Sequence, residues 1–221
     1  MSEIRVENII GETGVDAVNF TKGVNVTGIA TATNVSVGSS VTASTFHGSG
    51  AALTGVSAGK ILQVKQTYKT DVFSTTTQGT QIDITGLSVS ITPSSASSKI
   101  LVTSDVCGHT HNGSGGNLQI KRTISGSSTV IGLADAASNR RLSSFSGSLY
   151  TGDGGGSGNL LMTAHTKILD SPNTTSAITY QVTMTVRQNS VLYCVNRTET
   201  DSDTDDYTRG VSNITVMEVE A

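Results

Sequence analysis

Three side chains with metal-binding chemistry alternate along one short segment. Cys107, His109 and His111 occupy every second position, and in an extended strand such residues share a face. Imidazole is a common ligand of transition metals, so His109 and His111 form a candidate ligand pair. The alternative is a polar strand end that leads into the turn at 112–116. Both interpretations place these residues in a strand.

Four aspartates lie close together in a second segment: Asp201, Asp203, Asp205 and Asp206. Clustered carboxylates suit hard cations such as Ca²⁺. The first three match the start of an EF-hand loop, but Asp206 stands where that motif needs Gly, and Ser212 where it needs Glu. The pattern excludes an EF-hand and leaves a looser Ca²⁺ site at Asp201, Asp203 and Asp205. The alternative is a solvated acidic loop balanced by the neighbouring arginines.

Motifs of enzymes are absent from the sequence. It contains neither a Gly-x-Ser-x-Gly nucleophile elbow nor a His-Glu-x-x-His zinc motif, and the glycine-rich segment 154–158 lacks the Lys of a phosphate-binding loop. Glycan-cleaving enzymes use a pair of carboxylates, usually beside aromatic side chains, whereas this chain has no Trp and 4% aromatic residues. We therefore expect no enzymatic activity and no cofactor other than a metal ion.

The composition indicates that strands must position these side chains. The 221 residues include 30 Ser, 33 Thr and 24 Gly but only 2 Pro, and 14% are charged, against ~25% in ordinary soluble domains. Thr, Val and Ile favour a pleated, half-buried surface, whereas Ser and Gly favour tight turns. The composition predicts an all-β protein.

Charge and hydropathy limit the partners and the compartment. The net charge is −3, and Lys and Arg are scattered singly, which disfavours nucleic-acid binding. No apolar run reaches the ~18 residues that a membrane span requires, and residues 1–10 lack the order of a secretory signal. We expect a product made in the cytoplasm, without membrane insertion, in which Cys107 and Cys194 are reduced core thiols, with one disulfide bridge between them as the alternative.

The most unusual stretch is residues 23–59, which contain no Asp, Glu, Lys or Arg over 37 positions. Short units with Val and Gly recur loosely within it, at 24–28 and again at 35–38. Such a unit has too few apolar side chains for a core of its own and becomes stable only when it is wound with or stacked on neighbours. The pattern predicts an intertwined β shaft, with a flexible tether as the alternative.

From residue 60 onward, apolar and polar residues alternate in well-separated runs. The clearest is 178–186, where every second residue is Ile, Tyr, Val or Met. About nine or ten runs, separated by turn residues, predict a β-sandwich or jelly roll. In 82–91 the apolar phase changes across Thr85 and Gly86, which indicates a β-bulge. The run 214–219 is apolar on both faces, which predicts a central strand.

Two groups of segments carry a resemblance to a known family. They are residues 2–6 and 14–33 near the N-terminus, and residues 86–102, 169–172 and 212–219 near the C-terminus. Together these segments resemble the fibre-type virion proteins of marine phages and cyanophages, whose tail-fibre proteins share a recurring C-terminal β domain. The resemblance implies a homotrimer with an outward-facing head and an N-terminus that binds other virion proteins. In such a trimer, His109 and His111 of three copies could supply six imidazoles to one metal ion.

These observations predict a non-enzymatic virion structural protein, most specifically a trimeric tail or head fibre made in the host cytoplasm. Its expected parts are a virion attachment segment at 1–22, an intertwined β shaft at 23–59 and a β-sandwich or jelly-roll head at 60–221. The head is expected to contact a host surface receptor or glycan. A capsid decoration protein is the alternative, and a tailspike-type polysaccharide depolymerase is a more distant one.

Overall fold

The computed structural model describes residues 25–27, 29, 31, 38, 42, 60–110, 116–145, 160–187 and 191–220. The chain divides into two compact units, Met1–Thr54 and Gly55–Ala221. The strands among the described residues all lie in the second unit. The expected attachment segment lies outside the described residues, and so does the expected shaft apart from seven isolated positions.

The described residues form ten β-strands and no helix, which confirms the all-β prediction. In chain order the strands are β1 (Ile61–Lys69), β2 (Phe73–Thr75), β3 (Ile82–Ile91), β4 (Lys99–Thr110), β5 (Gly116–Ile124), β6 (Ser127–Ile131), β7 (Met162–Asp170), β8 (Ile178–Val186), β9 (Tyr193–Val195) and β10 (Ser212–Val219). Accordingly, this part of the chain offers no helix that is long and apolar enough to cross a membrane.

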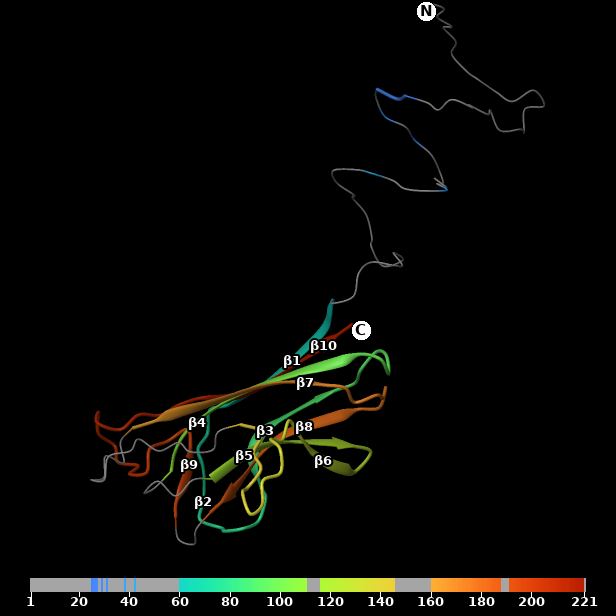
Figure 1. The fold of residues 1–221 in the computed structure, drawn as a ribbon. Coiled ribbons are helices and arrows are strands. Elements are labelled where there is room, and N and C mark those ends of the chain that lie inside the picture. Colours follow the sequence, from blue (N-terminus) through green and yellow to red (C-terminus); the bar gives the residue numbers. More distant parts are fainter. Residues whose placement is uncertain are drawn as a thin grey trace, which may run out of the picture. The chain divides into compact units, whose positions relative to one another are not determined.

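The strands form two antiparallel sheets that pack face to face (Figure 1). In the larger sheet β10 lies between β1 and β4, and β7 pairs with the other edge of β4. The short strands β9 and β2 extend this sheet beside the end of β4. The smaller sheet has the order β3-β8-β5-β6. The two layers therefore make a β-sandwich, as the alternating runs predict.

The chain follows the path of one long hairpin that is rolled into two layers. β1 pairs with β10, β3 with β8, β4 with β7, and β5 with β6, each time antiparallel. The tip of the hairpin is Ser125 and Gly126, whose φ angles of 48° and 84° are those of a two-residue type I′ turn. Eight strands paired in this way in two layers have the jelly-roll topology.

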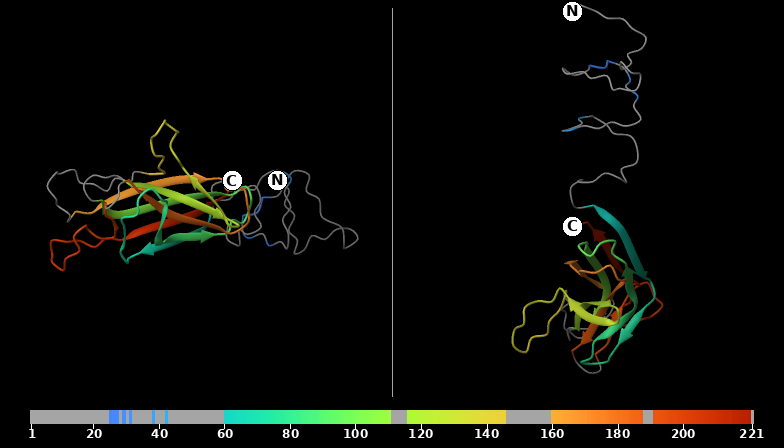
Figure 2. Two further views of the ribbon diagram at one scale, coloured as in Figure 1. Left: turned by 90° about the horizontal axis from the view of Figure 1, so that it is seen from below. Right: turned by 90° about the vertical axis from the view of Figure 1, so that its right-hand side faces the viewer.

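The two ends of the rolled hairpin meet at one corner of the sandwich. The backbone N–H of Glu220 donates a hydrogen bond to the carbonyl oxygen of Lys60 at 2.9 Å. The right-hand view of Figure 2 shows the C-terminus beside the start of β1. The chain therefore enters and leaves the jelly roll at the same place.

Alternation of side chains fills the space between the sheets. In β8 the residues Ile178, Tyr180, Val182, Met184 and Val186 are fully buried, as their spacing predicts. Burial of each such side chain stabilises the fold by roughly 1.5–3 kcal/mol. The core therefore combines aliphatic, aromatic and Met side chains from both layers.

The predicted β-bulge in β3 is confirmed. The pairing register of β3 with β8 shifts between Asp83 and Ser88, and Gly86 has a φ of 81°, which a residue with a Cβ adopts only with strain. The shift changes the phase of the strand, so Ile84 before the bulge and Leu87 after it both face the core.

A buried carboxylate joins the two layers. Arg122 Nη1 of β5 donates to both carboxylate oxygens of Asp170 in β7, at 2.7 and 3.0 Å, and the Tyr180 hydroxyl of β8 donates to the same group at 2.7 Å. Burial, together with the neighbouring carboxylate, raises the pKa of Tyr180, which therefore stays protonated as a donor. Asp170 thus ties the edge of the larger sheet to the smaller one.

A second carboxylate, that of Glu218, is fully buried beneath the connection between β3 and β4. It accepts hydrogen bonds from the backbone N–H and the hydroxyl of Ser94, both at 2.7 Å, and from Gln63 Nε2 at 2.6 Å. Burial opposes its ionisation, but the hydrogen bonds from Ser94, Gln63 and Ser98 outweigh burial and lower the pKa of Glu218 to about 2. Ser94 and Glu218 lie in two of the segments that carry the family resemblance. These two residues of the resembling segments therefore stabilise the fold.

Glu218 should make the stability of the protein depend on pH. Its folded pKa lies below its ordinary value of 4.5, so its stabilisation is complete above about pH 4.5 and is lost as the pH falls toward 2. The shift corresponds to roughly 3 kcal/mol. We expect the free energy of unfolding of Glu218→Gln to fall by that much less between about pH 6 and pH 2 than that of the unmodified chain. Urea denaturation at a series of pH values measures this difference. Asp135→Asn, at an exposed site, is the control, and an equal pH dependence in all three proteins would contradict the role of Glu218.

Candidate functional site

The structure places Cys107 and His109 on the same face of β4, as their spacing predicts, but it holds His109 inside the protein. His109 is 4% exposed. Nδ1 lies 3.0 Å from the carbonyl oxygen of Leu160, so Nδ1 is the protonated nitrogen, and Nε2 lies 3.5 Å from the carboxylate of Glu199. His111 lies outside the described residues. Both ring nitrogens of His109 thus have protein partners, and the metal site at His109 and His111 stays a prediction.

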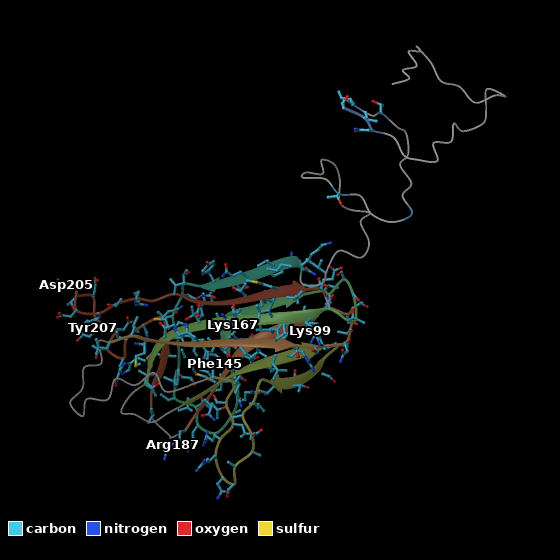
Figure 3. All side chains as sticks on the ribbon, turned by 45° about the horizontal axis from the view of Figure 1, so that its top comes forward. Lys99, Phe145, Lys167, Arg187, Asp205 and Tyr207 are labelled. Atoms are coloured by element: carbon cyan, nitrogen blue, oxygen red, sulfur yellow. The ribbon has the colours of Figure 1, made fainter. Side chains whose placement is uncertain are left out.

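The loop between β9 and β10 holds the aspartates. Asp201 Oδ1 lies 2.7 Å from Arg209 Nη2, and its Oδ2 lies 3.9 Å from Arg197 Nη1. Asp201 and Asp203 line a depression of about 240 Å³ in this loop, whereas Asp205 does not line it and lies with Tyr207 at the far end of the domain (Figure 3). No group of three His, Cys, Asp or Glu side chains among the described residues is arranged to hold a metal ion. The pairing of Asp201 with arginines is what the acidic-loop alternative describes, and the Ca²⁺ site at Asp201, Asp203 and Asp205 stays a prediction.

The cysteines are free thiols. Cys194 is buried and Cys107 is half-buried, and burial raises the pKa of both, that of Cys194 to about 11. Thiols with raised pKa values are poor nucleophiles and poor ligands. Their role is packing beneath the loop between β9 and β10, where Gly210 lies against the Cys107 side chain.

The outer face of the larger sheet, which points away from the smaller sheet, carries exposed apolar side chains. Strand pairing aligns Val64, Met217, Leu101 and Leu169 across β1, β10, β4 and β7, and we call these four residues the apolar row. Val64 is 52% exposed and Leu169 is 56% exposed, whereas the two central residues are half-buried. With strands ~4.8 Å apart, the row is ~15 Å long. It crosses the whole four-stranded part of the sheet.

A second row on the same face is polar, and it lies four positions away from the apolar row along each strand. There the pairing aligns Tyr68, Asn213, Asp105 and His165. Asp105 Oδ1 lies 2.6 Å from His165 Nδ1, and Oδ2 accepts a hydrogen bond from Asn213 Nδ2 at 3.0 Å. Burial opposes the ionisation of Asp105, but these hydrogen bonds lower its pKa. A shallow depression of about 460 Å³ is lined by Thr103, Asp105, His165, Thr166 and Lys167, the last labelled in Figure 3.

The outer face of the smaller sheet is polar in its described part, with one exception. The hydroxyls of Ser90 and Thr179 lie 2.8 Å apart, as do those of Thr123 and Ser128. Among the side chains that β3, β8, β5 and β6 turn outward in the described residues, Val130 is the one that is apolar. The two outer faces of the sandwich therefore differ in chemistry, although they are built from equally regular strands.

Sequence reasoning missed the apolar row, although one strand contained a signal for it. The run 214–219 has Ile214 and Val216 on one face and Met217 and Val219 on the other. The inference of a central position is confirmed, because β10 lies between β1 and β4. A central strand in a two-layer sandwich has its outer face uncovered, so Met217 and Val219 are only half-buried. Burial of that second face requires something outside the domain.

Comparisons with known proteins give a fold likeness alone. No protein-family model matches the chain, and no curated protein matches it. Among solved structures, the structure of infectious bursal disease virus Gx strain aligns with 73% of this chain and 38% of its own, at 12% identity and a TM-score of 0.32. The crystal structure of the infectious bursal disease virus VP2 subviral particle aligns with 71% of this chain and 38% of its own, at 16% identity and a TM-score of 0.30. The chain thus spans well under two thirds of either protein, and a likeness at this level carries no information about function.

The fold and its two faces define the class of the described unit, which is an all-β jelly-roll domain with one partly apolar outer face. Jelly rolls occur in viral capsid proteins, lectins and cupins, so the class alone does not fix a function.

Proposed function

We propose that the chain is a non-enzymatic virion structural protein of the fibre type, in which three copies each carry the jelly roll as a head. The observation that carries this proposal is the common corner where the chain enters at Lys60 and leaves at Glu220. Because both ends lie at that corner, one N-terminal stalk can bear the domain without covering either of its faces. The 37 uncharged residues at 23–59 directly precede the corner and supply the stalk.

The remaining parts of the proposal follow from this arrangement. Residues 1–22 attach the stalk to other virion proteins, and the head, at the far end, reaches a receptor or glycan on the host surface. The carboxylates of the two depressions support a binding or structural role rather than catalysis, since Asp105 is engaged by His165 and Asp201 by Arg209. Glycoside hydrolysis would instead need two carboxylates that are free to act on a bound sugar.

Antibody labelling of virus particles tests the proposal. Gold-labelled antibodies against the full chain, applied to purified particles of the virus that encodes it, should mark thin projections in electron micrographs. Mass spectrometry of the same particles should find the chain. Label spread evenly over the capsid lattice would support a decoration protein instead, and a chain absent from particles would refute a virion role of either kind. A chain without residues 1–22 should be absent from particles while folding normally.

A further inference from the structure

We propose that the apolar row is the surface through which copies of this chain pack against one another, so that the larger sheet of each copy faces the axis of the assembly. This inference rests on the proposed function, because it assigns a surface to the assembly proposed there. The partner is a second copy of the same chain. The smaller sheet of each copy then faces solvent.

The contrast between the outer faces of the two sheets supports the choice of surface. Outward side chains of the smaller sheet hydrogen-bond one another, as in the Ser90–Thr179 pair, and lose contact with water if they are covered. The side chains of the apolar row have no polar atoms to desolvate, apart from the weakly accepting sulfur of Met217. Covering the row is therefore favourable, whereas covering the opposite face is costly.

The position of the chain outside the jelly roll supports the choice of partner. Residues 1–59 join the domain at Lys60, and the next three apolar residues are Ile61, Leu62 and Val64, all exposed. A stalk shared by several copies would hold their rows close together at this corner. Tethering of this kind gives an effective concentration in the millimolar range, at which a small apolar contact suffices for association. A different protein would have no such advantage at this corner.

The charge pattern of the face fits the same arrangement. The line of residues next to the apolar row is Gln66, Thr215, Thr103 and Lys167, which contains one charge. Beyond it, Asp105 and His165 pair with each other, and Tyr68 is 64% exposed. Interfaces between proteins have an apolar centre that is poor in charge and a polar rim, and Tyr and Met are enriched in them relative to the rest of the surface. The face has this composition over its described part.

A pair of surface substitutions tests the inference on the full chain. Val64→Lys combined with Leu169→Lys places two charges on the row at positions that are already half exposed, so the fold of each copy should persist. Leu133→Lys is the matched control, because Leu133 is 40% exposed and lies beside Asn117 and Gln119 of the smaller sheet. Sedimentation and light scattering should give three times the chain mass for the unmodified chain and for Leu133→Lys. The double variant should dissociate at least 100-fold more readily while its circular dichroism spectrum stays unchanged.

A measurement without substitutions covers the case in which the double variant fails to fold. Met217 lies in the centre of the row, whereas Met162 is exposed at the start of β7. Peroxide should oxidise Met217 at least tenfold more slowly in the assembled protein than after dilution to the dissociated form, and it should oxidise Met162 at one rate in both.

The outcomes separate this inference from the proposed function. A double variant that stays trimeric, or a Met217 whose oxidation does not change with assembly, would overturn the role of the row and leave the fibre proposal standing. An unmodified chain that is monomeric at high concentration would refute both the role of the apolar row and the proposed trimer. Dissociation caused by Leu133→Lys would also refute the row, because it would show that the contact lies elsewhere.

Discussion

A chain that ends after Gly210 should not fold. The truncation removes β10, which pairs with β1 on one side and β4 on the other, and takes Ile214 and Val216 out of the core together with the buried Glu218. Loss of the two aliphatic side chains alone costs roughly 3–6 kcal/mol, and the backbone groups of both neighbouring strands lose their partners. Domains of this size have free energies of unfolding of about 5–15 kcal/mol. The combined loss of side-chain burial and backbone hydrogen bonds therefore exceeds the stability of the fold. We expect insoluble or unfolded protein, with no sheet signal in circular dichroism.

Deletion of residues 1–20 is the matched control for this truncation. It removes about twice as many residues, but none of them belongs to the jelly-roll unit, Gly55–Ala221. The shortened chain should keep the circular dichroism spectrum and the melting temperature of the full chain. A soluble chain ending at Gly210 with a cooperative melting transition would show that β10 is dispensable, and it would refute the central role assigned to this strand.

Substitution of the buried Asn196 should have the largest effect of any single residue considered. Its Nδ2 donates to the carbonyl oxygens of Lys69 and Asp71 at 2.7 and 2.9 Å, and its Oδ1 accepts a hydrogen bond from the Ser212 hydroxyl at 2.7 Å. Each buried group left without a partner costs about 1–3 kcal/mol. Asn196 also has a φ of 62°, which Ala adopts at a cost of about 1–2 kcal/mol. We expect Asn196→Ala to lower the free energy of unfolding by roughly 3–5 kcal/mol in urea denaturation.

Two further variants separate the causes of that loss. Asn196→Gly removes the hydrogen bonds without the backbone strain and should be more stable than Asn196→Ala by about 1 kcal/mol. Asn213→Ala removes a half-exposed amide with one hydrogen bond, to Asp105, and should cost less than about 1 kcal/mol. Equal, small losses in all three variants would mean that the Asn196 contacts do not hold the end of β1 against β10.

The proposed arrangement gives the two faces of the jelly roll different tasks. The larger sheet would meet other copies through the apolar row, and the smaller sheet with its hydroxyl and amide side chains would face the medium. The loops at the end away from Lys60, among them the loop with Asp205 and Tyr207, would then be the parts of the head that reach outward. The low overall charge of the chain agrees with a surface on which hydroxyl side chains, rather than charged ones, contact water.

The sequence by itself determined the strands and their orientation. The alternation in 178–186 predicted both the strand and its buried residues, and the change of phase at Thr85 and Gly86 predicted the bulge. These features are local, because the period of two along a strand depends only on the backbone of that strand. The two-faced apolar run at 214–219 gave the central position of β10 for the same reason.

Only the tertiary structure decided where the polar and apolar side chains meet. Gln63 and Glu218 are 155 positions apart and hydrogen-bonded, and the residues of the apolar row become neighbours through three separate strand pairings. The residue types at 201–205 and at 109 predicted metal ligands. In the structure Asp201 instead pairs with arginines, and His109 lies against a carbonyl oxygen and a carboxylate. Residue type sets what a side chain can bind, but the long-range pairing of strands sets which partner it finds, and that pairing is a property of the whole chain.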